Sequence, residues 1–181
     1  MYAFFRSKVA GELDDLIQRV FLSLVESRDR IENDASVRAY LFRIARNELY
    51  SMFRRRKTDR VVGAVGDVSV EDLGERPCEV IARRQEQRLL LRALRRIPLD
   101  DQIALELFYW ESLSGAEIAR VLGVPEGTAR TRLRRARAAL RAQVERLAAT
   151  AGAARSTSDD LDRWVASLRS YMAAESAVGE G

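Results

Sequence analysis

The side chains whose type and spacing most clearly suggest a binding function are arginines in the second half of the chain. Residues 126–141 contain six arginines and a single acidic residue, Glu126. A guanidinium is planar and permanently charged, and it donates paired hydrogen bonds to phosphate oxygens or to the edge of a guanine. At about 100° per residue, these arginines lie largely opposite a regular apolar stripe on a helix. The stripe consists of Ala129, Leu133, Ala136 and Leu140.

The residues around this helix start have the format of a helix-turn-helix. Ser114 followed by Glu117 forms the sequence of a capping box. Gly123 suits the left-handed residue that ends a helix, and Pro125 suits the first turn of the next one. The second helix of such a motif enters the major groove of DNA with its N-terminal residues facing the bases. The candidate DNA contacts are therefore Thr128, Arg130, Thr131, Arg132, Arg134 and Arg135. The alternative is an ordinary helical hairpin with a solvated arginine face.

A second long helix is predicted from Val37 to about Arg56, with Ser36 as its N-cap. Its buried stripe is expected to contain Val37, Leu41, Ile44, Ala45 and Met52, with Glu48 on the same apolar side. Another amphipathic helix is predicted over residues 13–25. The polar face of the long helix interleaves aromatic, basic and amide side chains: Tyr40, Arg43, Arg46, Asn47, Tyr50 and Arg54.

Charge alternates along the chain and suggests its domain organisation. Residues 1–57 carry twelve basic and eight acidic groups, residues 58–80 two and six, residues 81–147 fourteen and eight, and residues 148–181 three and five. Two basic blocks around an acidic connector suit two modules that bind a polyanion. The 23 residues of the connector could reach about 75–83 Å when fully extended, but average roughly 24–29 Å as a flexible coil. We therefore predict an all-α protein of two small helical domains, 1–57 and 81–147, joined by a flexible linker, 58–80, with one amphipathic helix in a C-terminal extension, 148–181.

Several classes of protein are disfavoured by composition. The chain has no histidine and one cysteine, Cys78, so a disulfide framework, a cysteine-based zinc cage and imidazole catalysis are excluded. The sequence offers no Gly-rich phosphate loop and no nucleophile–base pair, which predicts a protein that is not an enzyme and needs no cofactor or metal. Asp100 and Asp101 are interpreted as helix-start acids that favour the helix dipole. The absence of a long apolar run and of a signal-peptide core predicts a cytoplasmic protein without membrane insertion.

Together these segments resemble the extracytoplasmic-function sigma factors of bacterial RNA polymerase. Residues 97–140 are similar to region 4 of that family, with Glu117-Ile118-Ala119, the turn from Gly123 to Thr128 and the run from Thr131 to Arg137. Residues 37–56, with Asn47 in an Ile-Ala-Arg-Asn motif, are similar to the helix of region 2 that opens and reads the −10 element. Residues 14–24 are similar to the helix that docks on the polymerase clamp. The matching positions there are Asp15, Leu16, Gln18 and Phe21.

The resemblance implies a function and a set of partners. A sigma factor binds the clamp and flap of core RNA polymerase and directs initiation at promoters, with region 4 on the −35 element and region 2 on the −10 element. The loop from Arg30 to Ser36 and the aromatic-basic face of the long helix would then capture flipped bases. The family also implies an anti-sigma partner and a location at the nucleoid. The alternative is a stand-alone helix-turn-helix regulator, which would have no use for residues 13–56.

Overall fold

The computed structural model describes residues 1–9, 11–27, 34–56, 65–73, 85–151 and 165. This part of the chain is helical, apart from short connections and one isolated bridge between Ser69 and Pro98. None of its helices is long and apolar enough to cross a membrane. The elements in chain order are α1 (Tyr2–Arg6), α2 (Leu13–Glu26), α3 (Asp34–Arg56), the 3-10 turn η2 (Val65–Asp67), α4 (Gln85–Arg95), α5 (Leu99–Tyr109), α6 (Gly115–Leu122) and α7 (Glu126–Ala151).

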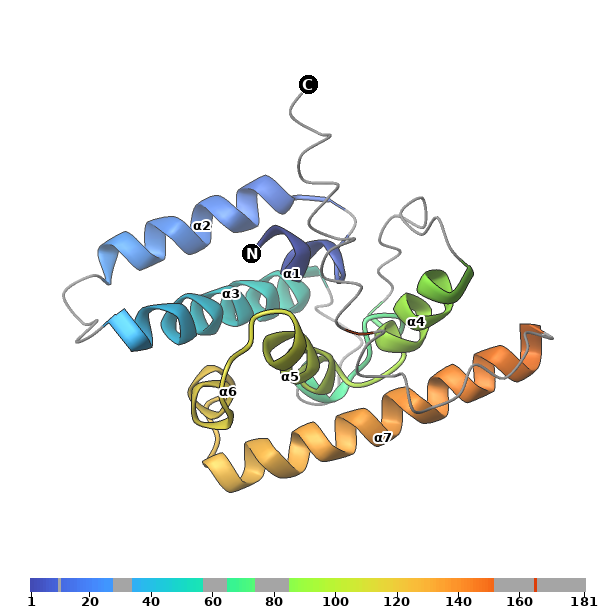
Figure 1. Cartoon of the computed structure of the whole chain (residues 1–181). Coiled ribbons are helices and arrows are strands. Elements are labelled where there is room, and N and C mark those ends of the chain that lie inside the picture. Colours follow the sequence, from blue (N-terminus) through green and yellow to red (C-terminus); the bar gives the residue numbers. More distant parts are fainter. Residues whose placement is uncertain (10, 28–33, 57–64, 74–84, 152–164, 166–181) are drawn as a thin grey trace.

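The N-terminal half is built on the packing of α2 against α3 (Figure 1). Leu16 and Val20 of α2 have no exposed surface, as expected from apolar residues spaced four apart on one helix face. Arg19 of α2 lies 3.6 Å from Glu48 of α3, which gives a partner to the acidic residue that the sequence places on the apolar side of this helix.

The buried stripe of α3 differs from the predicted one. Ala45 and Met52 are buried as predicted, but Val37, Leu41 and Ile44 are only partly buried. Helix α3 begins at Asp34, so Ser36 lies inside it and the prediction of Ser36 as N-cap is wrong. The stripe shifts because α3 packs against α2 on one side and α6 on another. The residues that it buries are Ala39, Phe42, Ala45, Leu49, Met52 and Phe53.

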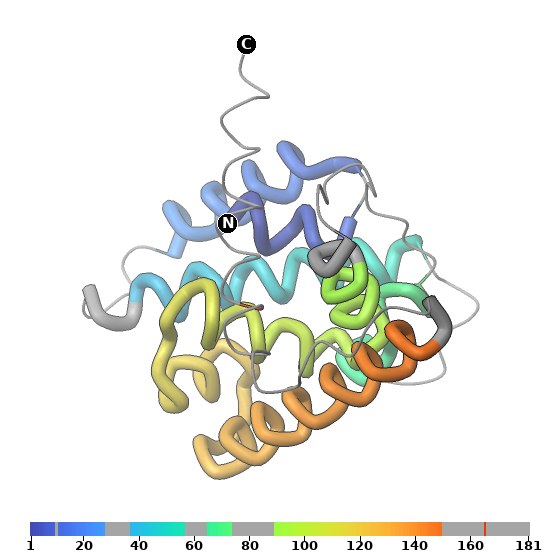
Figure 2. The backbone as a smooth tube through the Cα atoms, turned by 45° about the vertical axis from the view of Figure 1, so that its right-hand side comes forward, coloured from blue at the N-terminus to red at the C-terminus, as the bar shows by residue number. Residues whose placement is uncertain are grey.

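Helix α5 lies at the centre of the molecule. It has α3 above it and α7 below it in Figures 1 and 2, and it contacts α4, α6, α7 and η2. Every residue from Leu99 to Leu107 is buried. A short helix that is enclosed on all sides is expected to be apolar all round, yet α5 carries four buried polar residues. They are Asp100, Asp101, Gln102 and Glu106.

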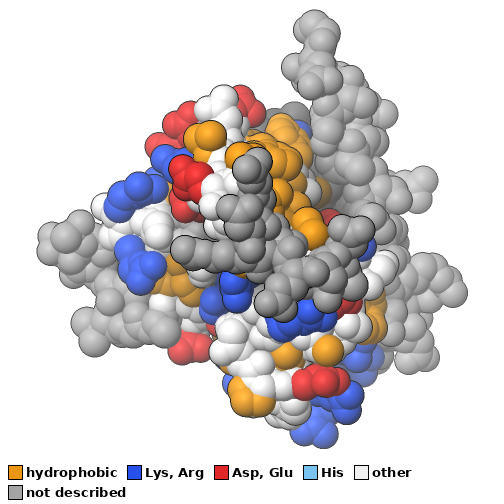
Figure 3. All heavy atoms as spheres, turned by 90° about the vertical axis from the view of Figure 1, so that its left-hand side faces the viewer, with side chains coloured by type: hydrophobic (Ala, Val, Ile, Leu, Met, Phe, Trp, Pro, Cys, Tyr) orange, Lys and Arg blue, Asp and Glu red, His pale blue; other side chains and the backbone are white. Residues whose placement is uncertain are grey.

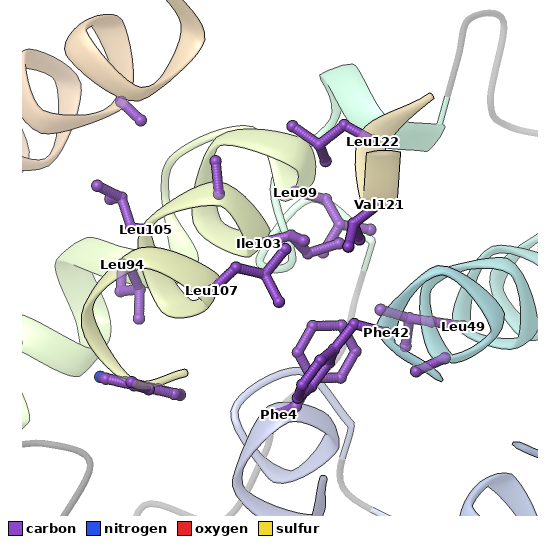
Figure 4. Packing of buried hydrophobic residues seen from close by; sticks show 14 of the residues in the cluster. Phe4, Phe42, Leu49, Leu94, Leu99, Ile103, Leu105, Leu107, Val121 and Leu122 are labelled. Carbon is purple, nitrogen blue, oxygen red and sulfur yellow. The ribbon is translucent and has the colours of Figure 1, made fainter. Parts of the chain in front are cut away.

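The two halves of the chain share one hydrophobic core (Figure 4). Phe4 of α1 meets Phe42 of α3 edge to face, with ring centroids 5.5 Å apart. Ile103 and Leu107 of α5 point toward this pair of rings in Figure 4. Helices α3 and α6 also pack directly against one another. The two helical units are therefore docked on each other in this structure.

Part of the acidic connector is folded onto α5, where the sequence predicts only a flexible linker. Val70 and Leu73 are buried, and the Leu99 amide donates to the Val68 carbonyl at 2.9 Å. The Glu71 carboxylate accepts hydrogen bonds from Arg96 at 2.6 and 3.2 Å. Val65 and Val70 are thus core residues, with Val68 partly buried beside them. Residues 58–64 and 74–80 of the connector lie outside the described part of the chain.

One residue of the C-terminal extension is described, and it packs on the helical core. Val165 is buried, and its carbonyl accepts a hydrogen bond of 2.8 Å from the Trp110 indole nitrogen. This contact agrees with a tail that folds back on its own chain. Trp164 and the rest of the predicted amphipathic helix lie outside the described residues.

Candidate nucleic-acid interface

Helices α6 and α7 form the predicted helix-turn-helix. The Ser114 hydroxyl accepts a hydrogen bond of 3.3 Å from the Glu117 amide, and the Glu117 carboxylate accepts one of 2.8 Å from the Ser114 amide. This is the reciprocal capping box expected from the sequence. Gly123 ends α6 in the left-handed region, at φ 68°, where a residue without Cβ is favoured. Ile118, Ala119 and Leu122 of α6 are buried, and α6 packs against α7, α3 and α5.

We expect Ser114→Ala to reduce the free energy of unfolding by about 1 kcal/mol, because the Glu117 amide loses its acceptor and the Glu117 carboxylate loses the hydroxyl donor. The measurement is urea unfolding followed by circular dichroism. Ser112→Ala, two residues earlier and outside the box, is the control for a serine lost in the same loop. An equal loss in both variants would contradict a specific role for the cap.

The exposed face of α7 presents the predicted DNA-contacting side chains. Thr128, Arg130, Thr131, Arg134 and Arg135 are exposed, and Arg132 is half-buried. The opposite stripe of Ala129, Leu133, Ala136 and Leu140 is buried as predicted. Arg130 is paired with Glu126 one turn earlier, and the Thr131 hydroxyl donates to the Gly127 carbonyl at 3.0 Å. A hollow of about 270 Å³ lies at the start of the helix, lined by Gly127, Thr128, Thr131, Arg132 and Arg135.

The polar face of α3 carries stacked pairs of an arginine and a tyrosine. The Arg43 guanidinium lies 4.6 Å from the centre of the Tyr40 ring, and that of Arg46 lies 4.4 Å from the Tyr50 ring. Arg43, Asn47 and Arg54 are exposed, whereas Arg46 and Tyr50 are half-buried. Of the loop from Arg30 to Ser36, residues 34–36 are the first turn of α3, and residues 30–33 lie outside the described part.

Asp100 connects the two predicted binding faces. Its carboxylate accepts two hydrogen bonds from Arg46 of α3, at 2.9 and 3.1 Å, and a further one from the Tyr50 hydroxyl. From the other side, Arg132 of α7 donates to it at 2.6 Å. The neighbouring Asp101 accepts hydrogen bonds of 3.3 and 3.0 Å from Arg135. Sequence reasoning assigned both aspartates to the helix dipole only, and so missed this role.

The electrostatics of this cluster follow from burial and charge. Burial alone would raise the pKa of the Asp100 carboxyl, but hydrogen bonds from Arg46 and Tyr50 and the adjacent positive charges outweigh burial and hold that pKa below its ordinary value. Burial, together with the Asp100 charge, raises the pKa of the Tyr50 phenol. Asp100 is therefore an anion and Tyr50 a neutral donor at physiological pH. The only sequence signal for the cluster is a pair of adjacent acids at the start of a largely apolar helix.

The predicted polymerase-binding residues on α2 divide into two groups. Asp15, Gln18 and Phe21 are exposed, the last with 49% of its surface accessible. Leu16 is fully buried, so in this structure it holds α2 on the core and is not available for contact with a partner. Leu22 and Val25, at 62% and 63% exposed, extend the apolar surface around Phe21. Figure 3 shows hydrophobic side chains gathered on this side of the molecule, at the height of α1 and α2.

The sequence and the fold both match known proteins. Residues 2–58 match the family Sigma-70 region 2, and residues 87–140 match Sigma-70, region 4. The chain is 31% identical over 143 residues to the RNA polymerase sigma factor HrpL of Pseudomonas syringae pv. syringae, covering 77% of each chain. It is 27% identical over 146 residues to the ECF RNA polymerase sigma-E factor of Escherichia coli (strain K12), covering 76% of each.

A solved structure has a similar fold. This is the sigma factor RpoE in a co-crystal with the anti-sigma factor NepR from Bartonella quintana. The TM-score is 0.59 and the sequence identity 24%, and the match covers 80% of this chain and 88% of that one.

Proposed function

The chain belongs to the extracytoplasmic-function group of sigma-70 RNA polymerase sigma factors, and on that premise we propose which of its surfaces contact promoter DNA and core polymerase. It directs promoter-specific initiation of transcription by RNA polymerase, and its family is not a family of enzymes. The exposed, arginine-rich face at the start of α7 carries the proposal most directly. We assign the chain no catalytic activity of its own.

We assign recognition of the −35 element to α7. Its first turns present hydroxyls and guanidinium groups side by side, and major-groove readout uses both kinds of group. Arg134 is exposed at the helix surface, and its planar guanidinium is suited to a guanine edge or a phosphate. Arg130 is held by Glu126 and is better placed for a phosphate contact. Region 4 also supplies the contact with the polymerase flap.

We assign capture of the −10 strand to α3. Arginine–tyrosine stacks on its polar face offer flat aromatic surfaces next to positive charge, and single-stranded DNA is bound by stacking and phosphate contacts of this kind. In the Tyr40–Arg43 pair the arginine is exposed and the tyrosine is half-buried. Asn47 lies one turn further on, where an amide can pair with the edge of a base. The Tyr50–Arg46 pair would join this surface once it is released from Asp100.

The exposed apolar patch of α2 is proposed as the polymerase-docking surface. Phe21, Leu22 and Val25 project from a helix that is otherwise well packed. A contiguous apolar surface of this kind is typical of a protein–protein contact. Asp15 and Gln18 flank it and would supply polar contacts at its rim. The same surfaces could take an anti-sigma protein, as the related RpoE takes NepR, and we propose such a partner in the cytoplasm near the nucleoid.

Transcription reconstituted from core RNA polymerase and the purified full-length chain tests the proposal. A promoter library should yield run-off products that depend on this chain. Phe21→Asp is expected to weaken core binding by about 10- to 100-fold, because burial of a phenylalanine side chain is worth roughly 1.5–3 kcal/mol. Core binding is measured by a fluorescence titration.

Phe108→Asp is the matched control, since Phe108 is also a partly exposed phenylalanine but lies on α5. If the wild-type chain binds core polymerase no better than Phe21→Asp, the assigned docking surface is wrong. If it supports no promoter-dependent product at any site, the assignment of the DNA-reading faces is wrong as well.

A further inference from the structure

Arg135, one of the arginines assigned to the −35 element, is held by a buried carboxylate. Its Nε donates to the Asp101 Oδ2 at 3.3 Å, and its Nη2 donates to the Asp101 Oδ1 at 3.0 Å. The Asp101 side chain is only 2% exposed, whereas that of Arg135 is 60% exposed. Asp101 belongs to α5, which is enclosed by its neighbours and packs against α7 (Figure 1). An acid fixed in the core thus holds an arginine that faces solvent.

The two hydrogen bonds occupy one edge of the guanidinium. A guanidinium has five N–H donors in a rigid plane. Asp101 binds the edge that is formed by Nε and Nη2. The edge formed by Nη1 and Nη2 keeps two parallel N–H groups, which match the O6 and N7 acceptors of guanine. We propose that Asp101 is a positioning residue that presents this second edge of Arg135 to a guanine of the −35 element, an inference that rests on the assignment of α7 to that element.

The charge of Asp101 favours a guanine over a phosphate as the group that Arg135 binds. The attraction of an arginine for phosphate is largely electrostatic, and a carboxylate at hydrogen-bond distance offsets much of it. The remaining N–H donors keep their direction, which is what a contact with a base edge requires. Arg135 also lines the hollow at the start of α7, beside Thr128 and Thr131. Its setting is therefore that of a residue that reads a base.

The other arginine–acid pairs among the candidate DNA contacts of α7 lack this combination. Arg132 is bound to Asp100, but its side chain is only 17% exposed. Arg130 is 73% exposed, but its partner Glu126 is itself 45% exposed, and exposed pairs hold their side chains weakly. Stability alone gives little reason for a buried acid, because replacing a buried ion pair with apolar groups is often neutral or stabilising.

The first test measures the order of the Arg135 side chain in the full-length chain, without polymerase or DNA. NMR relaxation of the side-chain nitrogen reports motion of the Nε–H bond on the picosecond to nanosecond timescale. This bond is expected to be as ordered as the backbone of α7 in the wild-type chain. It should become flexible in Asp101→Asn, because the amide has one oxygen acceptor and its NH2 group faces a donor. Arg135→Lys removes the signal and so assigns it. If the bond is flexible in the wild-type chain, or unchanged in Asp101→Asn, the positioning role is wrong.

The second test measures the affinity of holoenzyme for promoter duplexes in which each base pair of the −35 element is varied. Arg135→Lys keeps the charge and removes the paired donors, so it is expected to reduce the preference for one guanine by about 5- to 150-fold. Asp101→Asn is expected to reduce the same preference by about 3- to 10-fold, the worth of one hydrogen bond. In the double variant, the change at Asp101 should have no further effect on preference, because Asp101 acts through Arg135.

Asp67→Asn is the matched control, since Asp67 is exposed and its charge also acts on Arg135. Loss of this acid should tighten binding to all sequences slightly and leave base preference unchanged. If Asp101→Asn gives the same result, Asp101 only weakens phosphate attraction and the positioning role is overturned. An equal effect of Asp101→Asn with and without Arg135 would place its action on the fold instead. Circular dichroism establishes that the variants are folded.

The outcomes separate the guanine contact from the assignment of function. Arg135→Lys changes an exposed side chain, so it tests the guanine contact even if Asp101→Asn does not fold. If wild-type holoenzyme initiates at promoters and Arg135→Lys retains its base preference, only the guanine contact is wrong. If wild-type holoenzyme produces no promoter-dependent transcript, the proposed function is wrong and the guanine contact falls with it.

Discussion

Replacing Lys8 with methionine is expected to destabilise the docked state of the protein by about 3–5 kcal/mol, because it leaves the Glu106 carboxylate buried without its cation. Lys8 has no exposed side-chain surface and Glu106 has 1%. The carboxylate also accepts hydrogen bonds from Ser7 at 2.9 Å and Gln102 at 2.8 Å. Burial lowers the pKa of Lys8 and raises that of Glu106, so each charge depends on the other. Thermal unfolding by calorimetry measures the loss.

The double variant Lys8→Met/Glu106→Leu is the control. It removes both charges together and replaces them with apolar groups of similar size, which is often neutral or stabilising. We therefore expect it to recover most of the stability lost in Lys8→Met. A double variant as unstable as the single one would show that the ion pair itself stabilises the protein.

Replacing Arg134 with alanine is expected to weaken promoter binding by about 1–3 kcal/mol, or roughly 5- to 150-fold, and to relax the preference at one base of the −35 element. Arg134 is exposed on α7, on the face opposite the buried stripe. The measurement uses holoenzyme with promoter duplexes that vary in the −35 element. A phosphate contact would instead weaken all sequences alike and reduce the salt dependence of binding.

Arg92→Ala is the control for the loss of one positive charge. Arg92 is exposed on α4, away from the start of α7. Its loss should change promoter binding only through the small reduction in net charge. If Arg92→Ala and Arg134→Ala weaken binding equally, and neither changes sequence preference, α7 does not read the −35 element.

The features of the fold that the sequence predicts correctly are those determined by residues close to one another along the chain. The capping box of Ser114 and Glu117, the left-handed Gly123 and the apolar stripe of α7 each depend on residues within one or two helical turns. A local pattern is sufficient to place such features. The same reasoning placed Arg134 and Arg135 on an exposed helix face, and the structure bears out that exposure.

The parts that could not be predicted depend on contacts between distant residues. Lys8 and Asp100 would both be expected on the surface from their type alone, since charged side chains are seldom buried unless paired. Their partners are Glu106, Arg46 and Arg132, separated by between 32 and 98 positions along the chain. The shifted stripe of α3 has the same origin, because packing on α6 adds a second buried face.

The docked segment 65–73 also sets how far apart the DNA-reading helices can be. While this segment lies on α5, residues 57–64 alone connect Arg56, at the end of α3, to the part of the chain that is packed on α5. Eight residues span at most about 26–29 Å, whereas residues 57–84 together could span about 92–101 Å. Two promoter elements separated by two helical turns lie on the order of 70 Å apart. We therefore expect holoenzyme that engages both elements to lift the segment from α5, which would expose the buried side chains of Val70 and Leu73 to contact with polymerase.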